Sequence, residues 1–124
     1  MVPLQSGVES ASPLAVAGTA ALFALFLSVT AHIAARNVLG DVPVRNAFVV
    51  GPIPAAIAVV TAALSLPSGL GVVAAVVVDA LLVRSVYDLD RRLTAAVTVI
   101  HFVVSVILGS VVFSLYVLVQ SAPG

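Results

Sequence analysis

Residues 71–92 read GVVAAVVVDALLVRSVYDLDRR, and this stretch decides the fold. It begins as an apolar run interrupted by a single carboxylate, Asp79, and it ends in a cluster of charges. An apolar run of this length that stops at a group of arginines is typical of a helix that crosses a membrane and ends among the lipid headgroups. We therefore predict a transmembrane helix over 70–87 and a polar connector over 84–92.

The composition of the whole chain supports a membrane protein. Of its 124 residues, 62% are hydrophobic and 8% are charged. A soluble domain carries charge on roughly a quarter of its residues, so this chain cannot cover a soluble surface. The formal net charge is zero, which offers no basic field for nucleic acid. The absence of cysteine excludes thiolate zinc and iron–sulfur sites built by this chain alone, and we expect no cofactor.

Three further apolar runs predict transmembrane helices over 14–36, 46–66 and 93–119. No positive segment precedes the first run, so we expect it to be retained as a helix and not removed as a secretory signal. Pro52 and Pro54 lie near the start of the second run and predict a kink there. We predict an all-α four-helix transmembrane bundle that forms a single integral membrane domain over 1–124.

The arginines predict the orientation of the bundle. All five basic residues lie in or beside the two connectors 36–45 and 84–92; they are Arg36, Arg45, Arg84, Arg91 and Arg92. Connectors rich in arginine stay in the cytoplasm. We therefore expect a protein of the cell membrane with both termini extracytoplasmic, built from two out–in–out hairpins, and these arginines as its cytoplasmic charge anchors.

The exclusive use of arginine, together with the many alanines and valines, is typical of a GC-rich genome. In this composition the chain resembles small multi-pass membrane proteins of unknown function from halophilic archaea. The resemblance extends over the full length and rests on composition alone, so it implies no functional residue.

Small residues line one face of each of the first two helices. Ser28, Ala31 and Ala35 share a face of the first helix, and Gly51 and Ala55 share a face of the second. Small residues at such spacing let helices approach closely in lipid. We expect these faces to pack within the bundle, in preference to forming a dimer surface.

The fourth helix carries a polar stripe, because steps of four and three residues return to nearly the same angle. The stripe consists of Thr94, Thr98, His101 and Ser105. Lipid offers no hydrogen bonds, so we expect the stripe to point into the bundle. Its hydroxyls either bond to preceding carbonyls of their own helix or line a hydrated half-channel.

Asp79, His101 and His32 are the candidates for ion or proton binding. An ionised carboxylate inside a membrane costs a few kcal/mol, so Asp79 must be protonated, paired or hydrated. Arg84 lies about 140° further around the same helix and is not a natural partner. We expect His101 or His32 to pair with Asp79, either as part of a transport site or as a hydrogen-bonded clamp between helices.

Two histidines and a carboxylate also make up a known metal ligand set. No two of these three residues share a helix, so no local spacing supports such a site, and we predict no bound metal. The connector over 87–92 interleaves aspartates and arginines, which favours a solvated, self-paired turn over a partner contact.

The sequence contains no GxSxG, HExxH or Walker motif, and we expect no enzyme activity. The interpretation we favour is a structural or accessory membrane protein that packs on itself or on a larger membrane complex. The alternative is a small proton- or cation-coupled transporter or channel that works through Asp79 with His101 and His32.

Overall fold

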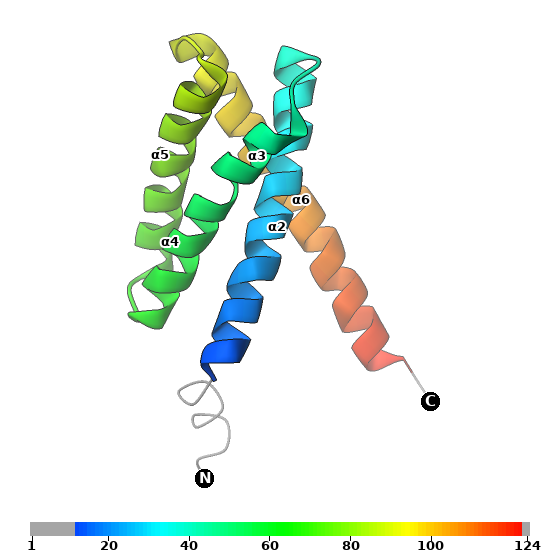
Figure 1. Ribbon diagram of the computed structural model, residues 1–124. Helices are drawn as coiled ribbons and strands as arrows, with labels where there is room; N and C mark the ends of the chain where they lie inside the picture. Colours follow the sequence, from blue (N-terminus) through cyan, green and yellow to red (C-terminus); the bar gives the residue numbers. More distant parts are fainter. Residues whose placement is uncertain (1–11, 123–124) are drawn as a thin grey trace.

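The computed structural model describes residues 12–122, which form helices joined by short connectors (Figure 1). The helices are α2 (Pro13–Leu39), α3 (Val44–Val50), α4 (Pro52–Ala63), α5 (Ser68–Tyr87) and α6 (Arg91–Ser121). Together α3 and α4 make one span, so the described residues contain four segments long and apolar enough to cross a membrane. The predicted all-α four-helix transmembrane bundle is confirmed. Most of the polar segment that precedes the first predicted helix lies outside the described residues.

The ends of the spans differ by a few residues from the predicted bounds. α2 continues past residue 36 to Leu39 and ends at Gly40, whose φ of 87° no other residue type adopts readily. The second span ends at Ala63 and not at residue 66, because Ser65 takes a left-handed φ of 57° and turns the chain toward α5. Glycines and turn residues, more than hydropathy, set these ends.

The second span is broken between α3 and α4, at the position where the prolines predict a kink. The break falls at Gly51, and α4 begins directly with Pro52. Pro52 and Pro54 have no amide hydrogen, so two carbonyls of the preceding turn lose their helical partners. The chain changes direction there while both pieces stay within the same span (Figure 1).

The spans are arranged in a ring in the order α2, α4, α5, α6 and back to α2. Each neighbouring pair in this ring shares backbone contacts, and α3 packs against α2 and α5. The diagonal pairs α2–α5 and α4–α6 share none among the described residues. The backbones of α2 and α5 are therefore too far apart to pack directly against each other.

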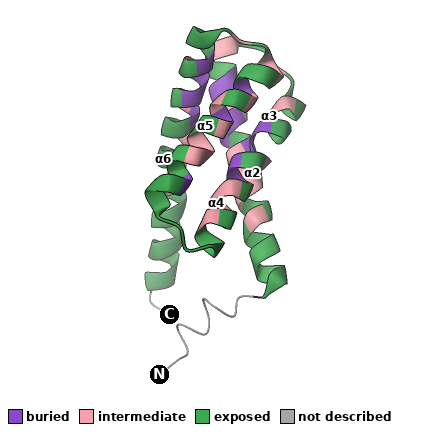
Figure 2. Ribbon diagram, turned by 90° about the vertical axis from the view of Figure 1, so that its left-hand side faces the viewer, coloured by how far each residue is buried: buried purple, intermediate pink, exposed green. Residues whose placement is uncertain are grey.

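Packing is concentrated at the end of the bundle that carries the charged connectors. The buried apolar cluster there consists of Ala31, Ala34, Ala47, Val50, Val83 and Val97. Buried residues gather toward this end, while the opposite end is exposed on every helix (Figure 2). α6 leaves α5 on its way to the far end, and every residue from 110 to 122 is exposed (Figure 1).

The predicted small faces of the first two spans meet inside the bundle. Ser28, Ala31 and Ala35 are buried on α2, and Gly51 and Ala55 are buried at the break between α3 and α4. A Cβ placed on Gly51 would collide with the backbone nitrogen and Cα of Ser28. The glycine is therefore required for the close approach of the two spans.

The second connector is organised by caps and not by paired charges, which corrects the expected self-paired turn. Asp88 takes a left-handed conformation after the last residue of α5, with a φ of 54°. Asp90 caps α6, with its carboxylate accepting a hydrogen bond of 2.8 Å from the amide of Leu93. Within residues 12–122 the ion pairs are Arg36–Asp41, which is exposed, and Asp79–His101.

Candidate functional site

The centre of the bundle holds a buried pair made by Asp79 of α5 and His101 of α6. The Nδ1 atom of His101 lies 2.8 Å from Oδ2 of Asp79. The side chain of His101 is 4% exposed and that of Asp79 is 7% exposed. Asp79 lies eight residues before the end of α5, which places the pair about 12 Å below the charged connector. Of the two histidines considered as partners, His101 is the one that contacts Asp79.

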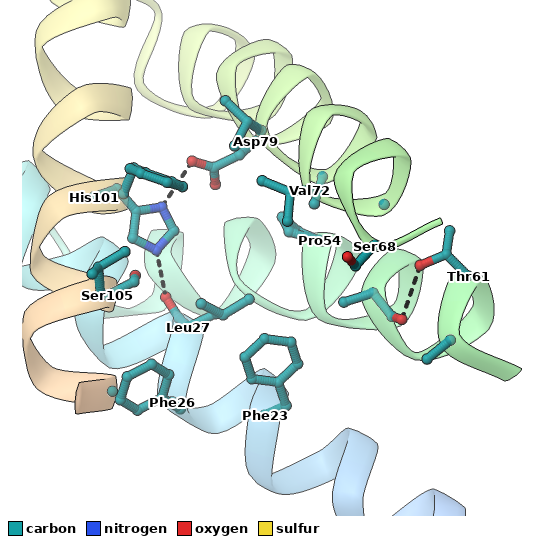
Figure 3. A pocket seen from close by; sticks show the side chains of 18 of the residues that line it. Phe23, Phe26, Leu27, Pro54, Thr61, Ser68, Val72, Asp79, His101 and Ser105 are labelled. Carbon is teal, nitrogen blue, oxygen red and sulfur yellow. Dashed lines mark hydrogen bonds and ion pairs between the residues drawn. The ribbon is translucent and has the colours of Figure 1, made fainter. Parts of the chain in front are cut away.

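The other edge of the His101 ring contacts α2. Its Nε2 atom lies 3.1 Å from the carbonyl oxygen of Leu27 and 2.9 Å from the hydroxyl oxygen of Thr30. Ser105, one turn further along α6, donates a hydrogen bond of 2.9 Å to the same Thr30 hydroxyl. The imidazole therefore links α2 to α5, the two diagonal helices that share no backbone contact within the described residues (Figure 3).

These contacts fix the hydrogen on Nε2 of His101. The Leu27 carbonyl can only accept, and the Thr30 hydroxyl already donates its one hydrogen to Leu27 over 3.1 Å. Both neighbours of Nε2 therefore need a donor, which assigns a hydrogen to this nitrogen.

A second proton must lie between Nδ1 and Oδ2. Without it, a ring lone pair would face a carboxylate lone pair across 2.8 Å, which is repulsive. The proton lies either on the carboxyl of Asp79 or on the ring of His101. In both cases the pair is neutral as a unit, which is how two ionisable groups are accommodated at this depth.

The polar stripe of α6 lies toward the inside of the bundle. Thr94, Thr98 and His101 are buried, and Ser105 is partly buried against α2. The hydroxyls of Thr94 and Thr98 have no hydrogen-bond partner within the described part of the chain, although both atoms are buried. They do not make the bonds to preceding carbonyls that were one of the two expectations for this stripe.

His32 does not join the pair, contrary to the expectation that groups it with Asp79 and His101. It lies two residues after Thr30, about 200° around α2, so it points away from the face that meets His101. Its Nδ1 atom is buried and has no partner among residues 12–122. Across the same residues no three histidine or acidic side chains are close enough to hold a metal ion.

The arginines that were predicted to be charge anchors lie outside the site. Arg36, Arg45, Arg84, Arg91 and Arg92 are all exposed at the end of the bundle that carries both connectors (Figure 1). Arg36 lies 3.5 Å from Asp41, and an exposed pair of this kind contributes little to stability. The uncharged turn between α4 and α5 lies at the opposite end.

Sequence reasoning missed Thr30 and the carbonyl of Leu27. The available signal for Thr30 is a buried-face hydroxyl in the middle of the first span, at about the depth of His101. No signal exists for the carbonyl, because every helical residue has one and only the packing of α2 against α6 selects it.

A cavity of about 590 Å³ lies beside the pair, in the centre of the ring. All four spans line it; Figure 3 shows Phe23 and Phe26 on one wall, Pro54 and Val72 on another, and Asp79 with His101 at one end. Oδ2 of Asp79 faces His101, and Oδ1 is the carboxylate oxygen that does not bond to the ring (Figure 3). Oδ1 is buried and has no partner within the described residues.

The fold and the site define a small multi-pass membrane protein with a neutral aspartate–histidine pair between its helices. Residues 10–123 match DUF7473, a family of unknown function, and the chain belongs to this family. No curated protein and no solved structure matches the chain. The matched region includes all four spans and every residue of the site. The resemblance to proteins of halophilic archaea stays a prediction.

Proposed function

We propose that the protein is a non-catalytic structural or accessory membrane protein, and that the Asp79–His101 pair is the clamp that holds its helices in place. The observation that carries this proposal is the position of His101, whose ring bonds α5 on one edge and α2 on the other. Hydrogen bonds between helices are a main source of association in lipid, where apolar surface gives no drive.

The proposal is tested by unfolding the purified protein with Asp79 replaced. Asp79→Leu removes the hydrogen bond between Asp79 and His101, and we expect it to lower the free energy of unfolding by about 1–2 kcal/mol. Asp79→Asn keeps a side chain that can donate to or accept from Nδ1, so its loss should be smaller. Val77→Leu, on the exposed side of the same helix, is the control and should behave as wild type. A variant Asp79→Leu as stable as wild type contradicts the clamp.

The accessory role further requires a partner surface. Support comes from α6, whose last turns leave the bundle and are exposed on all sides of the helix. We propose that this half of α6 packs on a second copy or on a larger membrane complex. Native electrophoresis of membranes solubilised in a mild detergent should show the protein above its monomer mass. A monomer that co-migrates with nothing else would contradict an accessory role.

We also propose that the protein lies in the cell membrane with both charged connectors in the cytoplasm and both termini outside. The arginines at one end of the bundle support this orientation. The chain lacks cysteine, so single cysteines report on it directly. In intact cells a membrane-impermeant maleimide should label Ser65→Cys, in the uncharged turn, and should leave Asp41→Cys unlabelled until the cells are opened. The reverse pattern contradicts the orientation.

A second candidate function is proton- or cation-coupled transport through Asp79 and His101. The observation that favours it is the cavity, which ends at the pair and leaves one oxygen of Asp79 without a partner within the described residues. His32, which was grouped with this candidate, makes no bond to the pair among the described residues, so we base the candidate on Asp79 and His101.

Transport is tested in liposomes that contain the purified protein and a pH-sensitive dye. A transporter predicts proton flux that Asp79→Asn abolishes while the unfolding temperature of the variant stays near that of wild type. Flux that is equal in wild type, Asp79→Asn and protein-free liposomes excludes this candidate and leaves the structural role.

A further inference from the structure

We propose that the central cavity is a binding site for a neutral amphiphile, with an apolar body among the aromatic and aliphatic walls and a single hydroxyl head at Asp79 and Thr98. This site is independent of whether the protein is an accessory protein or a transporter.

The size and lining of the cavity fit the apolar body of such a molecule. Its volume of about 590 Å³ falls within the range of roughly 300–1,000 Å³ that is usual for small-molecule sites. The residues along its length are mainly aromatic and aliphatic; they include Phe23, Phe26, Val72, Val76, Phe102 and Val106. A row of water molecules along these walls would find few hydrogen bonds, so an apolar molecule is the better occupant.

The polar end of the cavity specifies the head group. Asp79 and Thr98 both line the cavity, are 5% and 7% exposed, and each has a buried oxygen without a partner among residues 12–122. Oδ1 of Asp79 can only accept in the ionised form, and the hydroxyl of Thr98 has a hydrogen to donate. A hydroxyl head can donate to Oδ1 and accept from Thr98 at the same time, whereas an acyl chain can do neither.

The charge of the site favours a neutral head over an ammonium. The pair of Asp79 and His101 holds one shared proton and is neutral as a unit, so a cation that entered would have no net countercharge. An ammonium also has no acceptor for the Thr98 hydroxyl. Oδ1 itself exposes less than 1 Å² of surface, so a neighbouring side chain must turn before a head group reaches it.

The experiment uses the full chain in lipid nanodiscs and a long-chain alcohol that carries a photoreactive diazirine in its tail. Peptide mapping after illumination should place the label on the cavity walls, on Phe23, Phe26 or Phe102. Unlabelled hexadecanol should compete with the label at a concentration at least fivefold lower than hexadecane, because only the alcohol bonds to the head-group end.

Three outcomes overturn the proposal. Equal competition by hexadecane and hexadecanol would show that the cavity binds any lipid tail and does not recognise a hydroxyl head. Stronger competition by hexadecylamine than by hexadecanol would assign the site to a cation. Label spread evenly over the exposed surface of the bundle would show that no site exists.

Two pairs of variants separate binding from folding. Thr98→Val should weaken competition by hexadecanol about five- to tenfold, the size expected for one lost hydrogen bond. Thr94→Val is its match, since it loses a buried, unpartnered hydroxyl on the same helix that does not line the cavity. Equal effects of the two variants contradict a role for Thr98.

The second pair of variants tests whether filling the cavity away from its polar end blocks binding. Gly109 lines the cavity, and a Cβ placed there would meet only Phe26, at 3.8 Å. Gly109→Leu should therefore be accommodated and should block labelling. Gly18→Leu makes the same change on an exposed helix surface with nothing within 4 Å, and should leave labelling unchanged. Undiminished labelling of a folded Gly109→Leu protein would contradict the site.

Discussion

The two ends of the bundle are built from similar residues but are held together differently. At the end with the charged connectors, buried apolar side chains and small-residue contacts join all the spans. At the opposite end α4 and α5 stay together at their turn, where Gly71 packs against Thr61, but every residue of α6 from 110 to 121 is exposed. The Asp79–His101 pair and the cavity lie where the packed half gives way to the open half.

This difference shows what packing requires in a membrane. Both halves of the spans consist mainly of apolar residues, so hydropathy alone does not explain why one half is closed and the other open. Lipid tails solvate apolar side chains as well as other helices do, and association depends on close backbone approach and polar contacts. The closed half contains Gly51 against Ser28 and the bonds of His101, whereas residues 110–121 of α6 in the open half are all exposed.

The largest expected effect comes from the closest backbone contact of the packed half. In Gly51→Ala the new methyl group would collide with backbone atoms of Ser28, which cannot turn aside. Overpacking of a rigid contact costs typically 1–3 kcal/mol and occasionally more, so we expect a loss of about 3 kcal/mol in the free energy of unfolding. Unfolding in a mixed detergent series measures it.

The matched variant for this prediction is Gly18→Ala. Gly18 has nothing within 4 Å of its added Cβ, and alanine is the better helix former, so stability should stay equal or rise slightly. If Gly51→Ala and Gly18→Ala have the same free energy of unfolding, the contact between α2 and the break in the second span does not hold the packed half together.

The next effect concerns the pair at the boundary between the two halves. A double-mutant cycle with Asp79→Leu and His101→Leu isolates the free energy of their mutual interaction from the other contacts of each residue. Hydrogen bonds between transmembrane helices average about 0.6 and reach about 1.7 kcal/mol in such cycles, and we expect a value in the upper part of this range because the pair is buried and short.

A control cycle with Val77→Leu in place of Asp79→Leu should give no coupling with His101→Leu. Val77 is on α5 but is half-exposed, with 52% of its surface accessible. If the Asp79–His101 cycle also gives zero coupling, the pair contributes no free energy to the association of the helices. The packed half is then stabilised by apolar and small-residue contacts.

A smaller effect is expected in the hairpin of α4 and α5. A Cβ on Gly71 would lie 2.6 Å from the hydroxyl of Thr61, a side-chain atom that can move. Gly71→Ala should therefore cost about 1 kcal/mol, less than Gly51→Ala. The second substitution Thr61→Ala makes room for the methyl group and should restore most of the loss. If Thr61→Ala does not restore stability, Gly71 is required for its backbone conformation and not because it leaves room for Thr61.

The spans and the kink followed from the sequence because they depend on local features. Apolar runs, the arginine clusters and the prolines at positions 52 and 54 act within a few residues, whatever the rest of the chain does. The contact between Asp79 and His101 could also be anticipated, since a carboxylate in a membrane needs a partner and the polar stripe of α6 places His101 at a similar depth.

The rest of the site depends on the ring order of the helices, which no local pattern contains. The side of α2 that meets α6 selects Thr30 and the Leu27 carbonyl and turns His32 away. The tilt and rotation of a transmembrane helix depend on how it packs against its neighbours. Here the decisive contact is the one between Gly51 and Ser28, which is possible only because Gly51 has no side chain. The cavity lies among all four spans, so no single run of the sequence reveals it.

The smallest effect compares one valine from each half of α6. Val97 is 1% exposed within the packed half, and Val112 is 57% exposed on the open half. Val97→Ala removes methyl groups that are packed against neighbouring residues, so it should cost about 1 kcal/mol. Val112→Ala removes methyl groups that contact only detergent tails, and the tails fill the space, so it should cost less than about 0.5 kcal/mol. Unfolding of the purified protein alone measures both. The same pair in whole membranes gives a sharper result: if Val112→Ala becomes as costly there as Val97→Ala, another protein covers the outer half of α6, as the accessory role requires.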